Sequence, residues 1–181
     1  MRIHLVGLVV GALVLGGAST SMATGWGVGG FAGVSIPIAQ DDAGNGTVYG
    51  ARMKLSLGGI LGLEPNFTYA KDGEWSVDNV DETFDGAKFT SLGVNLLIGA
   101  AGPVTTMRVF TFIGAKYFSV DSDVPETDSR LGGEGGLGIE FGAGNIGFEG
   151  RGGMEVMTLD GGGSRKWGYI TGGVNLYFGA P

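Results

Sequence analysis

Eight stretches of this chain alternate apolar side chains with small or polar ones. They cover 26–38, 47–57, 60–71, 88–99, 105–118, 131–142, 146–158 and 167–178. Successive side chains of a β-strand point to opposite faces, so a period of two predicts eight strands. No apolar run approaches the length of about 20 residues that a membrane-spanning helix needs. The pattern therefore predicts an all-β protein.

The connections between these stretches alternate in length. Those at 58–59, 100–104 and 142–145 are short, and those at 39–46, 72–87, 119–130 and 159–166 are longer and rich in Asp, Asn, Gly and Ser. All the long connections then fall at one end of an up-and-down barrel, which is the arrangement of outer-membrane barrels. We predict an eight-stranded antiparallel up-and-down transmembrane β-barrel.

Residue parity separates two faces but does not by itself say which face points inward. In the stretch 47–57, Tyr49, Met53 and Leu55 share one face and Arg52 and Lys54 share the other. A soluble lipocalin-like barrel would turn the apolar face inward, and a membrane barrel would turn it toward lipid. Three features favour lipid. Only 16% of residues are charged, aromatic residues assigned to the apolar face lie near strand ends, and mid-strand charges balance. The aromatic residues are Trp26, Tyr49, Tyr69, Tyr117, Trp167 and Phe178.

The balanced mid-strand charges are five bases and five acids. They are Arg52, Lys54, Arg108, Lys116 and Arg151 with Glu64, Glu134, Glu140, Glu149 and Glu155. Unpaired charges are costly at low dielectric, so we expect a salt-bridge network that fills the lumen. The alternative is a gate or narrow polar path. Aromatic residues also fall on this polar face, as core packing or as the lining of a cavity for an apolar solute: Phe31, Phe110, Phe112, Tyr169 and Tyr177.

Pro65 lies within the third predicted strand, where it removes a ladder hydrogen bond from a barrel that has no free edge. We expect a β-bulge at this position, or a displaced strand.

Residues 1–23 predict a secretory signal, with Arg2, an apolar run from Leu5 to Leu15 and a small-residue cleavage site at 21–23. Residues 24–181 are then one barrel domain. The chain has no Cys, and its one His is His4, inside the signal. Without an imidazole the mature chain has no Ser-His nucleophile pair, so we predict that it is not an enzyme and binds no cofactor or metal.

The formal net charge is −7, and thirteen of the eighteen acidic residues fall in the long connections. Phosphate backbones require clustered Lys and Arg, so nucleic acid is not expected as a partner. We interpret the acidic connections as a solvated cap.

The last stretch carries a further pattern at Thr171, Gly173, Leu176 and Phe178. It resembles the insertion signal of outer-membrane barrels, although the chain continues to Gly179-Ala180-Pro181. The mature chain resembles the small eight-stranded family that includes the OmpA membrane domain, OmpX and the opacity-type proteins. This resemblance implies a bacterial outer-membrane location, contact with outer-membrane lipids and lipopolysaccharide, and insertion by the barrel-assembly machinery.

We expect a monomer with a structural, envelope-integrity or surface-interaction role. Two alternatives remain: a narrow, porin-like pore or OmpW-like channel for small or apolar solutes, and a soluble lipocalin-like binder in the periplasm.

Overall fold

The computed structural model describes residues 25–38, 44–58, 60–73, 75–76, 83–84, 86–99, 106–121, 130–159 and 163–179. The predicted signal at 1–23 lies outside these residues, as do most acids of the long connections. Within the ranges given, no helix is long and apolar enough to cross a membrane.

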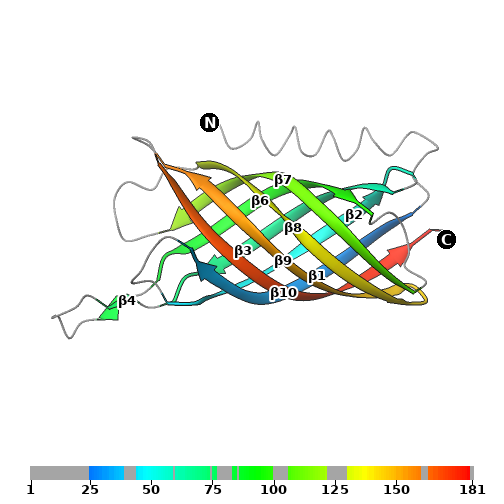
Figure 1. The fold of residues 1–181 in the computed structure, drawn as a ribbon, viewed down its shortest axis with the longest axis horizontal. Helices are drawn as coiled ribbons and strands as arrows, with labels where there is room; N and C mark the ends of the chain where they lie inside the picture. The colour runs from blue at the N-terminus through cyan, green and yellow to red at the C-terminus, as the bar shows by residue number, and fades with distance from the viewer. Residues whose placement is uncertain are drawn as a thin grey trace.

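Eight long antiparallel strands close into one barrel (Figure 1). They are β1 (Trp26–Pro37), β2 (Gly46–Ser56), β3 (Leu61–Lys71), β6 (Lys88–Ile98), β7 (Met107–Asp121), β8 (Arg130–Ala143), β9 (Ile146–Thr158) and β10 (Ser164–Phe178). The first and last strands pair from Trp26↔Phe178 to Pro37↔Trp167, which closes the barrel. The predicted fold class is confirmed.

The two ends of the barrel differ, as the connection lengths predict. At one end, which we call the turn end, lie the connections β2–β3, β6–β7 and β8–β9; the last is a two-residue turn in which Gly144 has φ 64°. At the other end, the loop end, the long connection predicted at 72–87 contains a short strand pair, β4 (Trp75–Ser76) and β5 (Thr83–Phe84). In Figure 1, β4 projects beyond the loop end, opposite the C-terminal end of β10.

The bulge expected at Pro65 does not form, and β3 is where the sequence places it. The β2–β3 register is the same on both sides of Pro65, from Arg52↔Asn66 to Leu55↔Leu63, but the two pairs between them are missing from the ladder. Both missing pairs would need an amide N–H at residue 65 to reach the Met53 carbonyl, and proline has none. The result is a gap in the ladder without a change of register.

The apolar face points outward, as predicted for a membrane barrel. Ile113, Leu137 and Ile170 are 60 to 64% exposed, and the polar face of every strand is turned into the lumen. A soluble barrel would show the opposite arrangement. The outward surface is the kind that a hydrocarbon layer covers, and the closed ladder leaves no strand edge for that layer to meet.

Aromatic residues mark both ends of this outward surface. Trp26 stacks on Phe178 with ring centroids 4.5 Å apart at the turn end, and Tyr49 lies 5.0 Å from Tyr69 toward the loop end. The assignment of Trp167 to this girdle is wrong. Trp167 is 4% exposed and shares the inward face of β10 with Thr171, because the two positions differ by an even number.

Candidate functional site in the charged barrel interior

The interior holds the ionisable side chains that the sequence places in mid-strand. Nine of the ten are at most 8% exposed, and the Arg108 side chain is 14% exposed. The nine are Arg52, Lys54, Glu64, Lys116, Glu134, Glu140, Glu149, Arg151 and Glu155. A buried charge is tolerated only where it is paired and hydrogen-bonded, so their contacts decide what this interior can do.

Seven of these residues form one connected group toward the turn end, the seven-residue cluster: Arg52, Lys54, Glu64, Arg108, Glu140, Glu149 and Arg151. The Lys54 Nζ lies 2.9 Å from Glu140 Oε2 and also contacts Glu149. Arg52 Nη1 is 2.7 Å from Glu149 Oε1, and Arg108 Nη2 is 2.7 Å from Glu140 Oε2. The contacts of Arg52 and Lys54 join β2 to β8 and β9, which lie far apart in sequence, whereas Arg108 and Glu140 face each other on the neighbouring strands β7 and β8.

Neutral side chains satisfy further hydrogen bonds of this cluster. Arg151 Nη1 donates to Glu64 Oε1 over 2.6 Å, and Asn95 Nδ2 donates to the same oxygen over 3.2 Å. The Tyr177 hydroxyl donates to Glu140 Oε1 over 2.6 Å. Charged and neutral groups therefore make one network, in which removing a member leaves its partners unsatisfied.

The other three charged residues, Lys116, Glu134 and Glu155, form the three-residue cluster nearer the loop end. The Lys116 Nζ lies 3.2 Å from Glu134 Oε2 and also contacts Glu155. Lys116 donates a further hydrogen bond to Thr68 Oγ1 over 3.2 Å, and the Tyr169 hydroxyl donates to Glu134 Oε2 over 2.8 Å.

Strands β8 and β9 place glutamates directly opposite one another at two levels of the barrel. The pairs are Glu134 with Glu155 and Glu140 with Glu149. Like charges directly opposite each other destabilise a ladder. A lysine from another strand contacts both members of each pair: Lys116 at the level nearer the loop end and Lys54 at the level nearer the turn end. Two lysines thus hold two pairs of carboxylates together.

The two clusters have opposite charge excesses. The seven-residue cluster holds four bases and three acids, and the three-residue cluster holds one base and two acids. With every group ionised, the excess is one positive charge toward the turn end and one negative charge toward the loop end. The ten residues together are neutral.

Aromatic rings fill the space around these charges. The Arg151 guanidinium lies 5.1 Å from the ring centre of Phe110 and 4.9 Å from that of Phe112, and Arg52 lies 4.9 Å from that of Phe31. Cations over aromatic faces are favourable where water is excluded. These rings pack against the clusters, which is the simpler of the two roles that the sequence left open for them.

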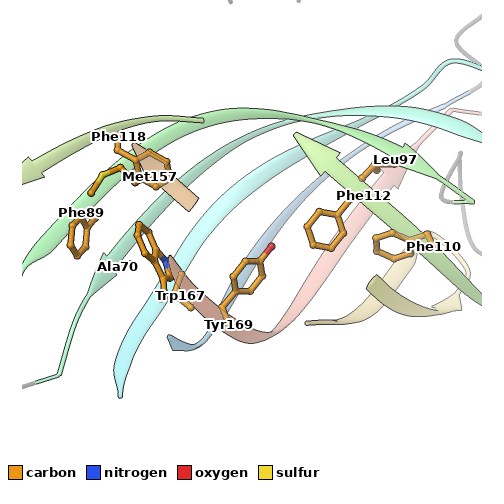
Figure 2. Close-up of a cluster of buried hydrophobic side chains, with 10 residues drawn as sticks. Ala70, Phe89, Leu97, Phe110, Phe112, Phe118, Met157, Trp167 and Tyr169 are labelled. Carbon is orange, nitrogen blue, oxygen red and sulfur yellow. The ribbon is translucent and has the colours of Figure 1, made fainter. Parts of the chain in front are cut away.

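An apolar layer covers the three-residue cluster on the side of the loop end. It consists of Val48, Ala70, Phe89, Phe118, Met157 and Trp167, all at most 5% exposed. Figure 2 shows Trp167 among Phe89, Phe118 and Met157, with Phe110, Phe112 and Leu97 gathered farther along the barrel. The Trp167 ring lies 5.5 Å from Phe89 and 5.6 Å from Phe118. Sequence parity could have found this layer, since all its members lie on inward positions.

An ion pair between Asp72 and Arg165 lies beyond this layer, at the mouth of the barrel. The Arg165 guanidinium also stands 4.8 Å from the ring centre of Phe89. Burial raises the pKa of the Asp72 carboxyl above its usual value, and the Arg165 charge opposes this shift. The sequence assigns Asp72 to the solvated acidic cap, but the residue is only 8% exposed.

The space left between the two clusters is small. A cavity of about 20 Å³ is lined by residues of both, among them Glu64, Lys116 and Arg151, and by Asn66 and Asn95. A cavity of this volume has room for about one water molecule. A hydrated ion or an organic solute does not fit there.

The residues of the C-terminal pattern lie on the faces that the sequence indicates. Thr171 is buried in the lumen, and Leu176 and Phe178 are 42% and 41% exposed on the outward face. Gly173 has a packing role of its own, because a Cβ at this position would come within 2.3 Å of the Arg52 guanidinium. Recognition of this pattern by the barrel-assembly machinery stays a prediction.

No protein-family model matches the chain, and no curated protein matches its sequence. Solved structures do match. Neisserial surface protein A superposes with a TM-score of 0.60 at 12% identity, over 84% of this chain and 97% of that one. Ail, the attachment invasion locus protein of Yersinia pestis, gives 0.56 at 15% identity, over 87% and 100%. A major outer membrane protein from Thermus thermophilus gives 0.51 at 14%, over 84% and 99%.

The chain has the fold of a small eight-stranded outer-membrane β-barrel. At these identities the likeness concerns the fold alone, and it carries no information about the residues of the two clusters. The outer-membrane location predicted from the sequence is supported by these neighbours together with the apolar exterior.

Proposed function

We propose that this protein is an integral outer-membrane barrel with a structural or surface-interaction role in the cell envelope, and that its ion-paired interior is a plug. The observation that carries the proposal is the filled lumen. Side chains occupy the interior from the apolar layer at the loop end to the seven-residue cluster, and the cavity between the clusters measures only about 20 Å³. A barrel of eight strands has just enough interior for such filling.

The proposed role needs no chemistry in the barrel. Outward apolar side chains hold the barrel in the bilayer, and the loop end presents the long connections to the outside. The partners proposed are outer-membrane lipids, lipopolysaccharide and, during insertion, the barrel-assembly machinery. That the chain is a monomer and not an enzyme stays part of this proposal.

The test is reconstitution of the mature protein in planar bilayers, after membrane extraction and a heat-modifiability gel have established that the barrel is folded. We expect no discrete conductance steps, because the ion pairs leave no continuous path. Discrete conductance steps with an ion preference would contradict the plug. If Arg108→Glu abolished that preference, the result would favour a narrow pore. Recovery of the protein in the soluble fraction without detergent would contradict the membrane role itself.

A further inference from the structure

Two asparagines of the barrel interior have side-chain oxygens that receive no hydrogen bond from the protein. They are Asn66 on β3 and Asn95 on β6, which are 8% and 1% exposed. Within the described part of the chain, no donor lies within hydrogen-bond distance of Asn66 Oδ1 or Asn95 Oδ1. Buried polar atoms in folded proteins nearly always have a partner, which is either a protein group or ordered water. These two oxygens therefore call for a donor from outside the polypeptide.

The nitrogen of each amide fixes the direction in which its oxygen points. Asn95 Nδ2 donates to Glu64 Oε1 over 3.2 Å. Asn66 Nδ2 lies 3.4 Å from Glu134 Oε1 and 3.4 Å from the Glu64 main-chain oxygen. Turning either amide over would set its oxygen against the oxygen of a carboxylate. Neither oxygen can therefore gain a donor by rotation of its own side chain.

A third buried asparagine, Asn175 on β10, shows the contrasting arrangement. It is 1% exposed, and its Nδ2 donates to Glu140 Oε1 over 2.8 Å. Its Oδ1 accepts a hydrogen bond from Arg52 Nε over 3.2 Å. Protein groups thus satisfy both ends of this amide, whereas at Asn66 and Asn95 they satisfy only the nitrogen.

Asn66 and Asn95 both line the cavity of about 20 Å³ between the two clusters. Glu64 is the ladder partner of Asn95, and Asn66 is two residues farther along β3. Diagonal neighbours of this kind have Cα atoms about 7–8 Å apart, so one small molecule can contact both side chains. On β7, Gly114 faces Asn95, and a Cβ there would collide with Asn95 Oδ1. The site therefore also depends on a glycine.

The charges around the cavity are balanced. Its lining includes three acids and three bases, which are Glu64, Glu134 and Glu155 with Arg52, Lys116 and Arg151. An added ion of either sign would disturb this balance, whereas a neutral molecule does not. A space of about 20 Å³ holds one water molecule. The hydroxyl of Thr68 also lines the cavity and can donate to the oxygen of such a water.

We propose that this cavity is a binding site for one water molecule, which donates its two hydrogens to Asn66 Oδ1 and Asn95 Oδ1. A buried water requires about two to four polar partners, and the two oxygens with the Thr68 hydroxyl provide them. The water extends a hydrogen-bonded connection from Glu134 through the two asparagines to Glu64, between the three-residue and the seven-residue cluster. The inference goes beyond the proposed function, because it assigns a ligand inside the plug.

The experiment is a crystal structure of the mature protein at a resolution that shows ordered waters, with rubidium chloride in place of sodium chloride. We expect one density peak in the cavity, about 2.8 Å from both amide oxygens and without the anomalous signal of rubidium. An empty cavity would overturn the site. A peak with the anomalous signal would also overturn it, because the occupant would then be a cation.

Two variants test whether the asparagines hold the water. Asn95→Leu removes one of the two oxygens, and the peak should disappear. Asn175→Leu is the matched control, since it removes a buried amide whose two ends have protein partners, and the peak should remain. Persistence of the peak in Asn95→Leu, or its loss in both variants, would contradict the assignment.

A heat-modifiability gel identifies a variant that does not fold, and the wild-type structure then decides alone. The test is also separate from the test of the plug. Discrete conductance steps in planar bilayers contradict the plug whether or not the water is bound. An empty cavity in a barrel that does not conduct contradicts the water site and leaves the proposed function standing.

Discussion

Lys116 is the residue whose removal should harm the barrel most directly. It is 3% exposed and contacts Glu134 and Glu155, which face each other across β8 and β9. We expect Lys116→Met to lower the free energy of unfolding by about 3–5 kcal/mol, because two buried carboxylates lose their shared cation. Urea titration of the protein folded into lipid vesicles measures this.

Two further variants show whether charge is the cause. Lys166→Met, on the outward surface, should change stability by less than about 0.5 kcal/mol. Adding Glu155→Gln to Lys116→Met should restore part of the loss, since one buried negative charge is then removed. If the double variant is no more stable than Lys116→Met, the lysine acts through packing rather than through its charge.

Asp72 makes the stability depend on pH in a defined direction. Its pKa is raised by burial, so the folded state binds this proton more tightly than the unfolded state does. The resulting stabilisation is complete below the unfolded pKa of about 3.9 and is lost as the pH rises through the raised pKa. The unfolding free energy of the wild type minus that of Asp72→Asn should therefore become more negative as the pH rises from 4 to 7. Arg165→Gln, which removes the opposing charge, should steepen this dependence. A flat difference would contradict the assignment.

At the scale of the strand, Pro65 interrupts the hydrogen-bond ladder between β2 and β3. We expect Pro65→Val to supply the missing N–H to the Met53 carbonyl and to stabilise the barrel by about 1 kcal/mol. Amide exchange at residues 64–66 and urea unfolding check this. Exchange at residue 65 as fast as at an exposed loop amide would show that the gap has a cause other than the proline ring.

Strand parity explains how much of the interior could be foreseen. The positions of Arg52 and Glu149 on inward faces follow from counting residues along each strand, and the same count places Trp167 inside. That Arg52 meets Glu149, far away in the sequence, does not follow from either strand alone. It depends on the shear of the closed barrel, which brings β2 opposite β9. The sequence alone also does not predict a ladder gap instead of a bulge at Pro65. The pairs on both sides of Pro65 keep one register, and they form only in the complete sheet.

At the scale of the whole molecule, the outward surface should respond to charge according to depth. Leu137 is 60% exposed in the middle of β8, and Ser119 is exposed near the loop end of β7. Leu137→Arg should cost about 2–4 kcal/mol in vesicles, and Ser119→Arg about 0–1 kcal/mol. Equal costs would mean that the bilayer does not surround the barrel at the height assumed here. Unfolding titrations in vesicles of matched thickness measure both.

The ion pairs across the lumen also bear on how the protein enters a membrane. Lys54 on β2 meets its glutamates on β8 and β9, so a sheet made only of the N-terminal strands would carry Arg52, Lys54 and Glu64 without these partners. Bare charges do not cross hydrocarbon at acceptable cost. We therefore expect that a partial sheet does not enter the bilayer core and that the strands close into a barrel as they enter the membrane. On this expectation, the ion pairs that fill the finished lumen also disfavour a half-inserted barrel.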